Sequence, residues 1–195
     1  MSAAILPAPP AADSLRRKRF TRAEVDRLLE LGFFNGARFE LIEGELIDKM
    51  GQNPPHAMAI QLLTAWLFRL LGPERVRVQL PIQLIGRDSD WSEPEPDIAV
   101  LITPSREYAR RHPSADELLL IVEVSDSSFR QDAIVKRDLY ARSSAPEYWI
   151  LDIQGRRLIV YREPMQGEYK SATILNEGDA ASFNGHSCPV RDLLP

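Results

Sequence analysis

The chain has 195 residues, a formal net charge of −4 and a pI near 5.5. This acidic balance argues against nucleic-acid binding through overall charge, although a local basic patch or a bound metal could still provide it. Apolar residues make up 44% of the chain, which is typical of a globular protein, and the length favours one domain. The single cysteine, Cys188, excludes an internal disulfide and fits a reducing cytoplasm.

The N-terminal residues 1–20 are expected to form a disordered tail with a basic end. Residues 1–13 are rich in Ala and Pro, and the basic run RRKR follows at 16–19. The tail lacks the features of a secretory signal, and no apolar run is long enough to span a membrane. We therefore expect a cytoplasmic protein without membrane contact, whose single domain covers residues 21–195.

A helix and a hairpin are the first predicted elements. The helix covers residues 21–32, with Thr21 as N-cap, Glu24 completing a capping box and Gly32 as the stop. Residues 39–50 then predict a β-hairpin around a central Glu-Gly pair.

The middle of the chain predicts a helix followed by three strands. The apolar spacing over residues 56–71 indicates an amphipathic helix. The alternating residues 76–84 predict a strand with one buried face, and Pro81 favours an edge position. Residues 96–103 and 117–125 predict two strands that are apolar on both faces, and we expect helices to cover them.

The last third of the chain predicts a helix over residues 131–142 and a second hairpin over residues 147–162. A further strand is expected at 169–175, within an otherwise loose C-terminal finish. The central order is helix, three strands, helix, strand. It predicts an α/β (α+β) fold with a mixed central sheet flanked by helices, an N-terminal helix and peripheral hairpins.

One residue, Glu123, places a carboxylate in the apolar strand LLLIVEVS. Side chains alternate along a strand, so Glu123 is expected to share a face with Leu119, Ile121 and Ser125, opposite Leu118, Leu120, Val122 and Val124. The preceding strand begins with another acid, Asp97. If the two strands pair, both carboxylates converge at one place.

Two converging carboxylates suit a hard cation such as Mg²⁺ or Mn²⁺, which activates water in phosphoryl chemistry. The alternative is that Asp97 only caps a turn. Lys136 lies on the next predicted helix, one turn after Asp132 and one turn before Tyr140, where it could orient a metal-bound water. It could equally form an exposed ion pair with Asp132.

Two further positions are secondary candidates. His56 begins a predicted helix and could contact a substrate phosphate or a metal-bound water, helped by the helix N-terminus, or could simply cap the helix. Glu40, Glu43 and Glu45 alternate in the first hairpin. Most of such a run is ordinarily a solvated face, and Glu45 is our choice for a further acid of the site.

The segments RFELIEGELIDKM, NPPHAMAIQLL, EPDIAVL, LLLIVEVSDSS and D-x-x-x-K-x-x-x-Y running into PEYWILD occur in this order. Together they resemble the Uma2 family, formerly a domain of unknown function, which is grouped with proposed restriction endonucleases in the PD-(D/E)xK nuclease superfamily. The resemblance covers roughly residues 38–162. It implies a restriction-endonuclease-like αβββαβ core, in agreement with the order read from periodicity.

Position by position, the resemblance makes Asp97 the first metal ligand and Glu123 the second. The usual lysine of the superfamily falls at Ser125, which is a departure from the pattern. Related sequences supply the lysine from the following helix, where Lys136 stands. The family also has an Ala-Gly pair where this chain has two serines, at 143–144.

The resemblance thus implies a Mg²⁺-dependent endonuclease, with Mn²⁺ as a possible substitute, that hydrolyses phosphodiester bonds in DNA. The expected catalytic residues are Asp97, Glu123 and Lys136, with His56, Glu45, Ser125 and Tyr140 as secondary candidates. Cleavage of both strands would favour a homodimer. One alternative is a catalytically inactive nuclease fold that binds nucleic acid or a protein partner. Another is a structural or dimerising protein in which Glu123 is simply paired with Lys136.

Overall fold

The computed structural model describes residues 17–34, 36–49 and 51–195. Most of the expected N-terminal tail, residues 1–16, lies outside the described residues. Phe20 is described, and its backbone N–H donates to the carbonyl of Gly44 at 2.9 Å. This bond attaches residue 20 to the first hairpin.

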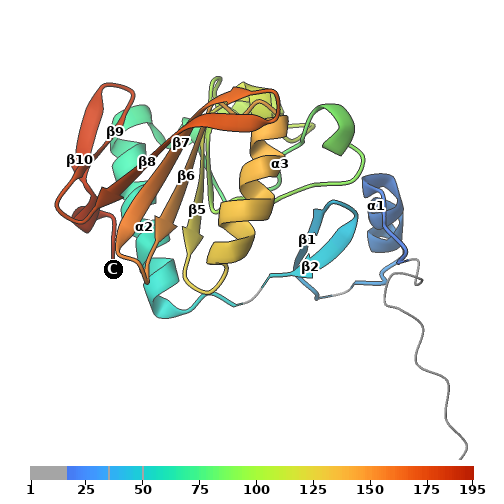
Figure 1. The fold of residues 1–195 in the computed structure, drawn as a ribbon. Helices are drawn as coiled ribbons and strands as arrows, with labels where there is room; N and C mark the ends of the chain where they lie inside the picture. Colours follow the sequence, from blue (N-terminus) through green and yellow to red (C-terminus); the bar gives the residue numbers. More distant parts are fainter. Residues whose placement is uncertain (1–16, 35, 50) are drawn as a thin grey trace, which may run out of the picture.

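A six-stranded mixed sheet forms the centre of the fold (Figure 1), in the spatial order β3-β4-β5-β6-β7-β8. Its strands are β3 (Val76–Val78), β4 (Ile98–Leu101), β5 (Leu118–Ser125), β6 (Glu147–Asp152), β7 (Arg157–Met165) and β8 (Glu168–Asn176). Strands β5 and β6 are parallel, and the other neighbours are antiparallel. Parallel neighbours need a crossover connection, and here a helical segment provides it. The predicted fold class is confirmed.

Helices cover both faces of the sheet, as the doubly apolar strands predicted. The long helix α2 (Pro54–Leu71) packs on one face, where Leu63 and Trp149 are fully buried. A π-helix (Gln131–Lys136) continues into α3 (Arg137–Arg142) on the other face. Each face therefore has its own apolar cluster.

The N-terminal part forms smaller elements beside the sheet. Helix α1 (Arg22–Glu30) has the predicted capping box at Thr21, and its C-cap is Leu31, the residue before the expected stop. Strands β1 (Phe39–Ile42) and β2 (Glu45–Asp48) form the predicted hairpin as a separate two-stranded sheet. Short 3-10 helices occupy Pro73–Arg75, Gly86–Asp88, Ser105–Tyr108, Ala115–Glu117 and Val190–Asp192.

Two predicted elements need correction, and a third extends the predicted core. Strand β3 ends at Val78 instead of reaching residue 84, because Gln79 has a left-handed backbone (φ 51) that turns the chain away from the sheet. The hairpin over residues 147–162 lies entirely in the central sheet: its first strand, β6, is the last strand of the predicted core, and its second strand, β7, continues the sheet beyond that core. The C-terminus is not loose, since β9 (Ala180–Phe183) and β10 (His186–Pro189) pair as a hairpin.

The alternation expected along β5 holds from Leu120 onward but fails at its start. The register with β4 shifts by one residue beside Leu119, which is a β-bulge. Leu118 consequently packs in the α3-side cluster and Leu119 against the α2-side cluster, the reverse of the prediction. Glu123 stays on the predicted face because it lies beyond the bulge.

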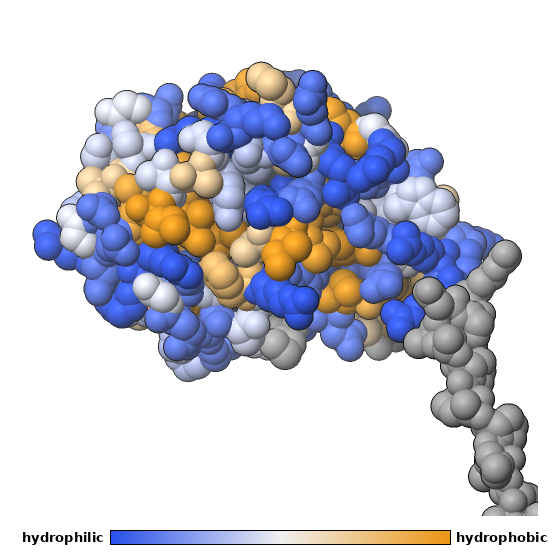
Figure 2. All heavy atoms as spheres, viewed as in Figure 1, coloured by the Kyte–Doolittle hydropathy of each residue, from blue (hydrophilic) through white to orange (hydrophobic). Residues whose placement is uncertain are grey.

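On the surface seen in Figure 2, polar side chains surround a band of apolar ones near α3 and the last strands of the sheet. The exposed apolar residues of this region include Ile134 and Val135 in the π-helix that precedes α3, and Ile174 in β8. None of the helices described has both the length and the apolar character that crossing a bilayer requires.

Candidate active site

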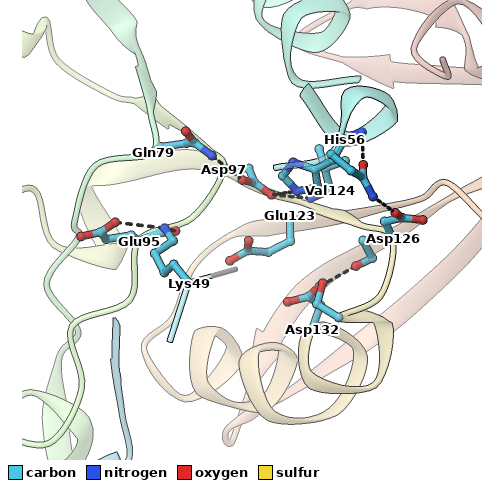
Figure 3. A network of polar contacts seen from close by, with 12 residues as sticks. Lys49, His56, Gln79, Glu95, Asp97, Glu123, Val124, Asp126 and Asp132 are labelled. Carbon is cyan, nitrogen blue, oxygen red and sulfur yellow. Dashed lines mark hydrogen bonds and ion pairs between the residues drawn. The ribbon is translucent and has the colours of Figure 1, made fainter. Parts of the chain in front are cut away.

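The two predicted acids lie across from each other on neighbouring strands. Strands β4 and β5 pair Ile98 with Val122, so the next positions, Asp97 and Glu123, face each other with their side chains on one side of the sheet. Both are buried, with 7% and 4% exposed surface. The structure thus brings together the carboxylates that the sequence placed at the ends of two strands (Figure 3).

Three donors hold the carboxylate of Asp97. Its Oδ2 accepts the backbone N–H of Val124 at 2.9 Å and lies 3.3 Å from Nε2 of His56, while Oδ1 accepts Nε2 of Gln79 at 3.1 Å. Burial would raise the pKa of Asp97, but the contact with His56 and the two other donors bring it below its ordinary value. Asp97 is therefore ionised at neutral pH.

Glu123 meets its two donors at a single oxygen. Its Oε1 accepts Nζ of Lys136 at 3.0 Å and the hydroxyl of Tyr140 at 2.8 Å. Burial raises the pKa of Glu123 to about 8, with Lys136 opposing and the nearby acids adding to the rise. The contact of Tyr140 places this secondary candidate directly against the site.

Lys136 is buried among acids. Besides Glu123, its Nζ lies 2.9 Å from Oε1 of Glu40 and 3.9 Å from Oδ1 of Asp132, and its side chain is 6% exposed. Burial opposes its charge, but the surrounding carboxylates, Glu123 first, hold the pKa of Lys136 above its ordinary value. The alternative of an exposed pair with Asp132 is wrong.

The π-helix explains how Asp132, Lys136 and Tyr140 all face the sheet. Four residues of an α-helix rotate by more than one full turn, whereas four residues of the wider π-helix rotate by less than one full turn. The step from Asp132 to Lys136 lies in the π-helix, and the step to Tyr140 lies in α3. The smaller rotation of the first step and the larger rotation of the second step offset each other, so all three side chains lie on the side that faces the sheet.

Ser125, where the resemblance implied the position of the usual lysine, bonds a neighbouring acid in this structure. Its hydroxyl donates to Oδ2 of Asp132 at 2.6 Å, and the hydroxyl of Ser128 reaches the same oxygen at 2.6 Å. Burial raises the pKa of Asp132, although Lys136 and the two hydroxyls oppose the rise. Ser125 thus holds the acid that lies beside Lys136.

His56 lies against Asp97 and not at an open helix end. The helix begins at Pro54, and its first two residues are prolines without N–H groups. The N–H of His56 already donates to the side chain of Asn53 at 3.0 Å. The first three residues of the helix therefore have no N–H group free for a phosphate, and the Asp97 contact raises the pKa of His56.

The structure selects a different hairpin acid from the one we chose. Glu45 is exposed and does not line the cavity, whereas Glu40 is buried beside Lys136. Glu40 also accepts the backbone N–H of Glu95 at 3.2 Å. The available sequence signal was that Glu40 shares a strand face with the buried Ile42.

These groups line a cavity of about 290 Å³. Besides Asp97, Glu123, Lys136 and His56, its walls include Arg38, Glu40, Lys49, Gln79, Glu95 and Asp132. Across the cavity from His56, Lys49 bonds the Glu95 carboxylate at 3.0 Å (Figure 3). Four buried acids, Glu40, Asp97, Glu123 and Asp132, line the cavity beside buried Lys136, so the site is rich in carboxyl groups.

The donor set suits a hard cation that keeps water ligands. Within the described residues, no three His, Cys, Asp or Glu side chains are grouped as a complete metal site. Mg²⁺ is usually held by one or two carboxylates, with water and substrate phosphate completing its shell. The opposed Asp97 and Glu123, in a site rich in carboxyl groups, fit that mode of binding.

Comparison with known proteins supports the fold and the family. The family model "Uma2: Putative restriction endonuclease" matches residues 23–186. The chain is also similar to a crystal structure from Anabaena variabilis, described as "a putative nuclease belonging to DUF820", with a TM-score of 0.64 and 16% identity. That match covers 87% of this chain and 96% of the other. A search of curated proteins finds no match.

Proposed function

Because the chain belongs to the Uma2 family, we propose that it is a Mg²⁺-dependent endonuclease that hydrolyses phosphodiester bonds in DNA. One observation carries the proposal. Buried Asp97 and Glu123 lie opposite each other on β4 and β5, with buried Lys136 bonded to one of them at 3.0 Å. Mn²⁺ has the same preference for oxygen ligands and should replace Mg²⁺.

In this mechanism Asp97 and Glu123 would each offer a carboxylate to a divalent metal ion. A bound Mg²⁺ would stabilise the charge that develops on the phosphate and increase the acidity of a water molecule. Gln79, Val124 and His56 already fix Asp97, while Tyr140 fixes Glu123. These bonds reduce the reorganisation needed when the substrate arrives.

Lys136 would orient the attacking water and offset phosphate charge. Its ammonium has three donors and lies beside Glu123, so it can keep this contact while donating to a water in the cavity. The neighbouring Glu40 and Asp132 keep it charged and limit its movement. Ser125 contributes through its bond to Asp132.

We propose DNA as the substrate from the family description, and a homodimer if both strands are cut, because each site would cleave one strand. Analytical ultracentrifugation with and without a DNA duplex tests the dimer. A monomer in both conditions, combined with double-strand cleavage, would contradict it.

A cleavage assay tests the function itself. Duplex DNA, single-stranded DNA and RNA are incubated with Mg²⁺, with Mn²⁺ or with EDTA, using wild type, D97N and E123Q. Loss of a metal ligand should lower the cleavage rate about 100-fold or more. The control is E168Q, since Glu168 is exposed on β8. Equal cleavage by wild type and both ligand variants overturns the proposal, and binding without cleavage would instead favour an inactive nuclease fold.

A further inference from the structure

Gln79 has an unusual backbone for a residue of its type. At φ 51 it lies in the left-handed region, directly after β3, and its side chain is partly buried. Residues other than glycine adopt this conformation at an energetic cost, because Cβ crowds the backbone. Such strain is kept where the surrounding structure or a function requires it.

Both polar ends of Gln79 contact the same residue. Its backbone N–H donates to the carbonyl of Asp97 at 3.0 Å, and its side-chain Nε2 donates to Oδ1 of Asp97 at 3.1 Å. The first bond continues the pairing of β3 with β4. The left-handed turn at this point then directs the amide to the carboxylate.

Gln79 differs in this respect from the other strained positions. Seven described non-glycine residues have a positive φ: Glu43, Gln79, Ser144, Arg156, Glu163, Gln166 and Asn184. Among these seven, Gln79 alone lines the cavity of the candidate site. Glu43 and Gln166 lie in the tight turns of hairpins, where a positive φ is needed for chain reversal.

The contact fixes one side of the Asp97 carboxylate. Val124 and His56 hold Oδ2, and Gln79 holds Oδ1, so rotation of the carboxylate about its terminal bond is restricted at both oxygens. We propose that Gln79 is a positioning residue, whose strained backbone aims its amide so that Asp97 is oriented to receive a divalent cation. This inference rests on the proposed function.

Two substitutions of Gln79 separate its effect on folding from its effect on metal binding. In Q79G the strain is relieved and the amide is lost, whereas in Q79A the amide is lost and the strain remains. Groups that orient metal ligands typically change metal affinity or activity about 10–100-fold when removed. Both variants lose the amide and should therefore bind metal more weakly. Only Q79A should lose stability, because in Q79G the relief of backbone strain offsets the lost hydrogen bond.

The experiment combines three measurements on the full chain. Isothermal titration with Mn²⁺ gives metal affinity, thermal melting without metal gives stability, and DNA cleavage against Mn²⁺ concentration gives activity. We expect both variants to bind Mn²⁺ about 10-fold more weakly, to need more Mn²⁺ for cleavage, and to recover part of their rate at saturating Mn²⁺. The melting temperature of Q79G should be no lower than that of wild type.

A matched control is Q166G, which makes the same substitution at φ 55 in the β7–β8 turn. It should leave Mn²⁺ affinity unchanged and, like Q79G, should melt no lower than wild type. Wild-type Mn²⁺ affinity in both Gln79 variants overturns the inference while leaving the proposed function standing. A wild-type protein that neither binds Mn²⁺ nor cleaves DNA overturns the proposed function, and the inference falls with it.

Discussion

Lys136 and Glu40 are in contact, with Nζ and Oε1 2.9 Å apart, although one lies on the π-helix and the other on the separate β1–β2 hairpin. Both side chains are buried, at 6% and 7% exposure. This ion pair joins the hairpin to the candidate catalytic lysine. The hairpin therefore forms one wall of the site.

The first prediction compares two acids of that hairpin. E40Q should lower the free energy of unfolding by about 1–3 kcal/mol, because a buried charge-assisted contact is lost. E45Q should change it by less than about 0.5 kcal/mol, because Glu45 is exposed. Urea denaturation of both variants measures the difference. Similar losses in the two variants would contradict the assignment of Glu40 to the site.

The second prediction concerns Lys136. K136M leaves buried Glu40, Glu123 and Asp132 without their shared cation, and should destabilise the metal-free protein by about 3–5 kcal/mol. Cleavage should fall about 100-fold or more, since a positioned charge near the reacting group is removed. Urea denaturation and the cleavage assay measure the two effects.

The control for Lys136 is K136R, which keeps the charge but not the compact ammonium. It should retain more stability than K136M while still losing activity. Mg²⁺ should raise the melting temperature of K136M, because binding to the folded state stabilises it. If Mg²⁺ leaves the melting temperatures of wild type and K136M unchanged, the pair with Glu123 is purely structural.

The third prediction is a pH dependence caused by Glu123. Its pKa is raised from an ordinary 4.5 to about 8, chiefly by burial, with Lys136 opposing and Asp132, Asp97 and Glu40 adding. Between these values the folded state keeps a proton that the unfolded state has released. The stabilisation from Glu123 is thus full below pH 4.5, falls as pH rises, and is lost above about pH 8.

Denaturation of metal-free wild type and E123Q at pH 5, 6, 7 and 8 tests this sign, with the pH values chosen to span the interval. The stability difference between the two proteins should change steadily in favour of E123Q as pH rises. Mg²⁺ should stabilise wild type more at the higher pH, because its ligands must be deprotonated. A difference that is independent of pH would contradict the raised pKa.

The fourth prediction concerns the serines after α3. Ser144 has φ 59, where the family pattern has glycine, and the buried hydroxyl of Ser143 has no hydrogen-bond partner among the described residues. S144G relieves the left-handed strain, and S143A removes an unsatisfied polar group. Together they should raise the free energy of unfolding by about 1–2 kcal/mol with unchanged cleavage. S144A keeps the strain, and a gain as large as that of S144G would refute the explanation.

By itself, the sequence determined the features that depend on local periodicity. The apolar runs specified β4 and β5, and the two-residue alternation put Glu123 on the correct face. The four-residue spacing of Asp132, Lys136 and Tyr140 indicated that they share one helix face. Asp97 and Glu123 could be brought together because neighbouring strands of a sheet commonly pair.

Only the tertiary structure decided which distant groups complete the site. Periodicity tells on which face a side chain lies, but it does not tell which remote segment packs against that face. Glu40 reaches Lys136 across 96 positions only because the hairpin folds against the π-helix. Gln79 reaches Asp97 because its backbone turns into a strained conformation that a glutamine adopts only when the surrounding contacts require it.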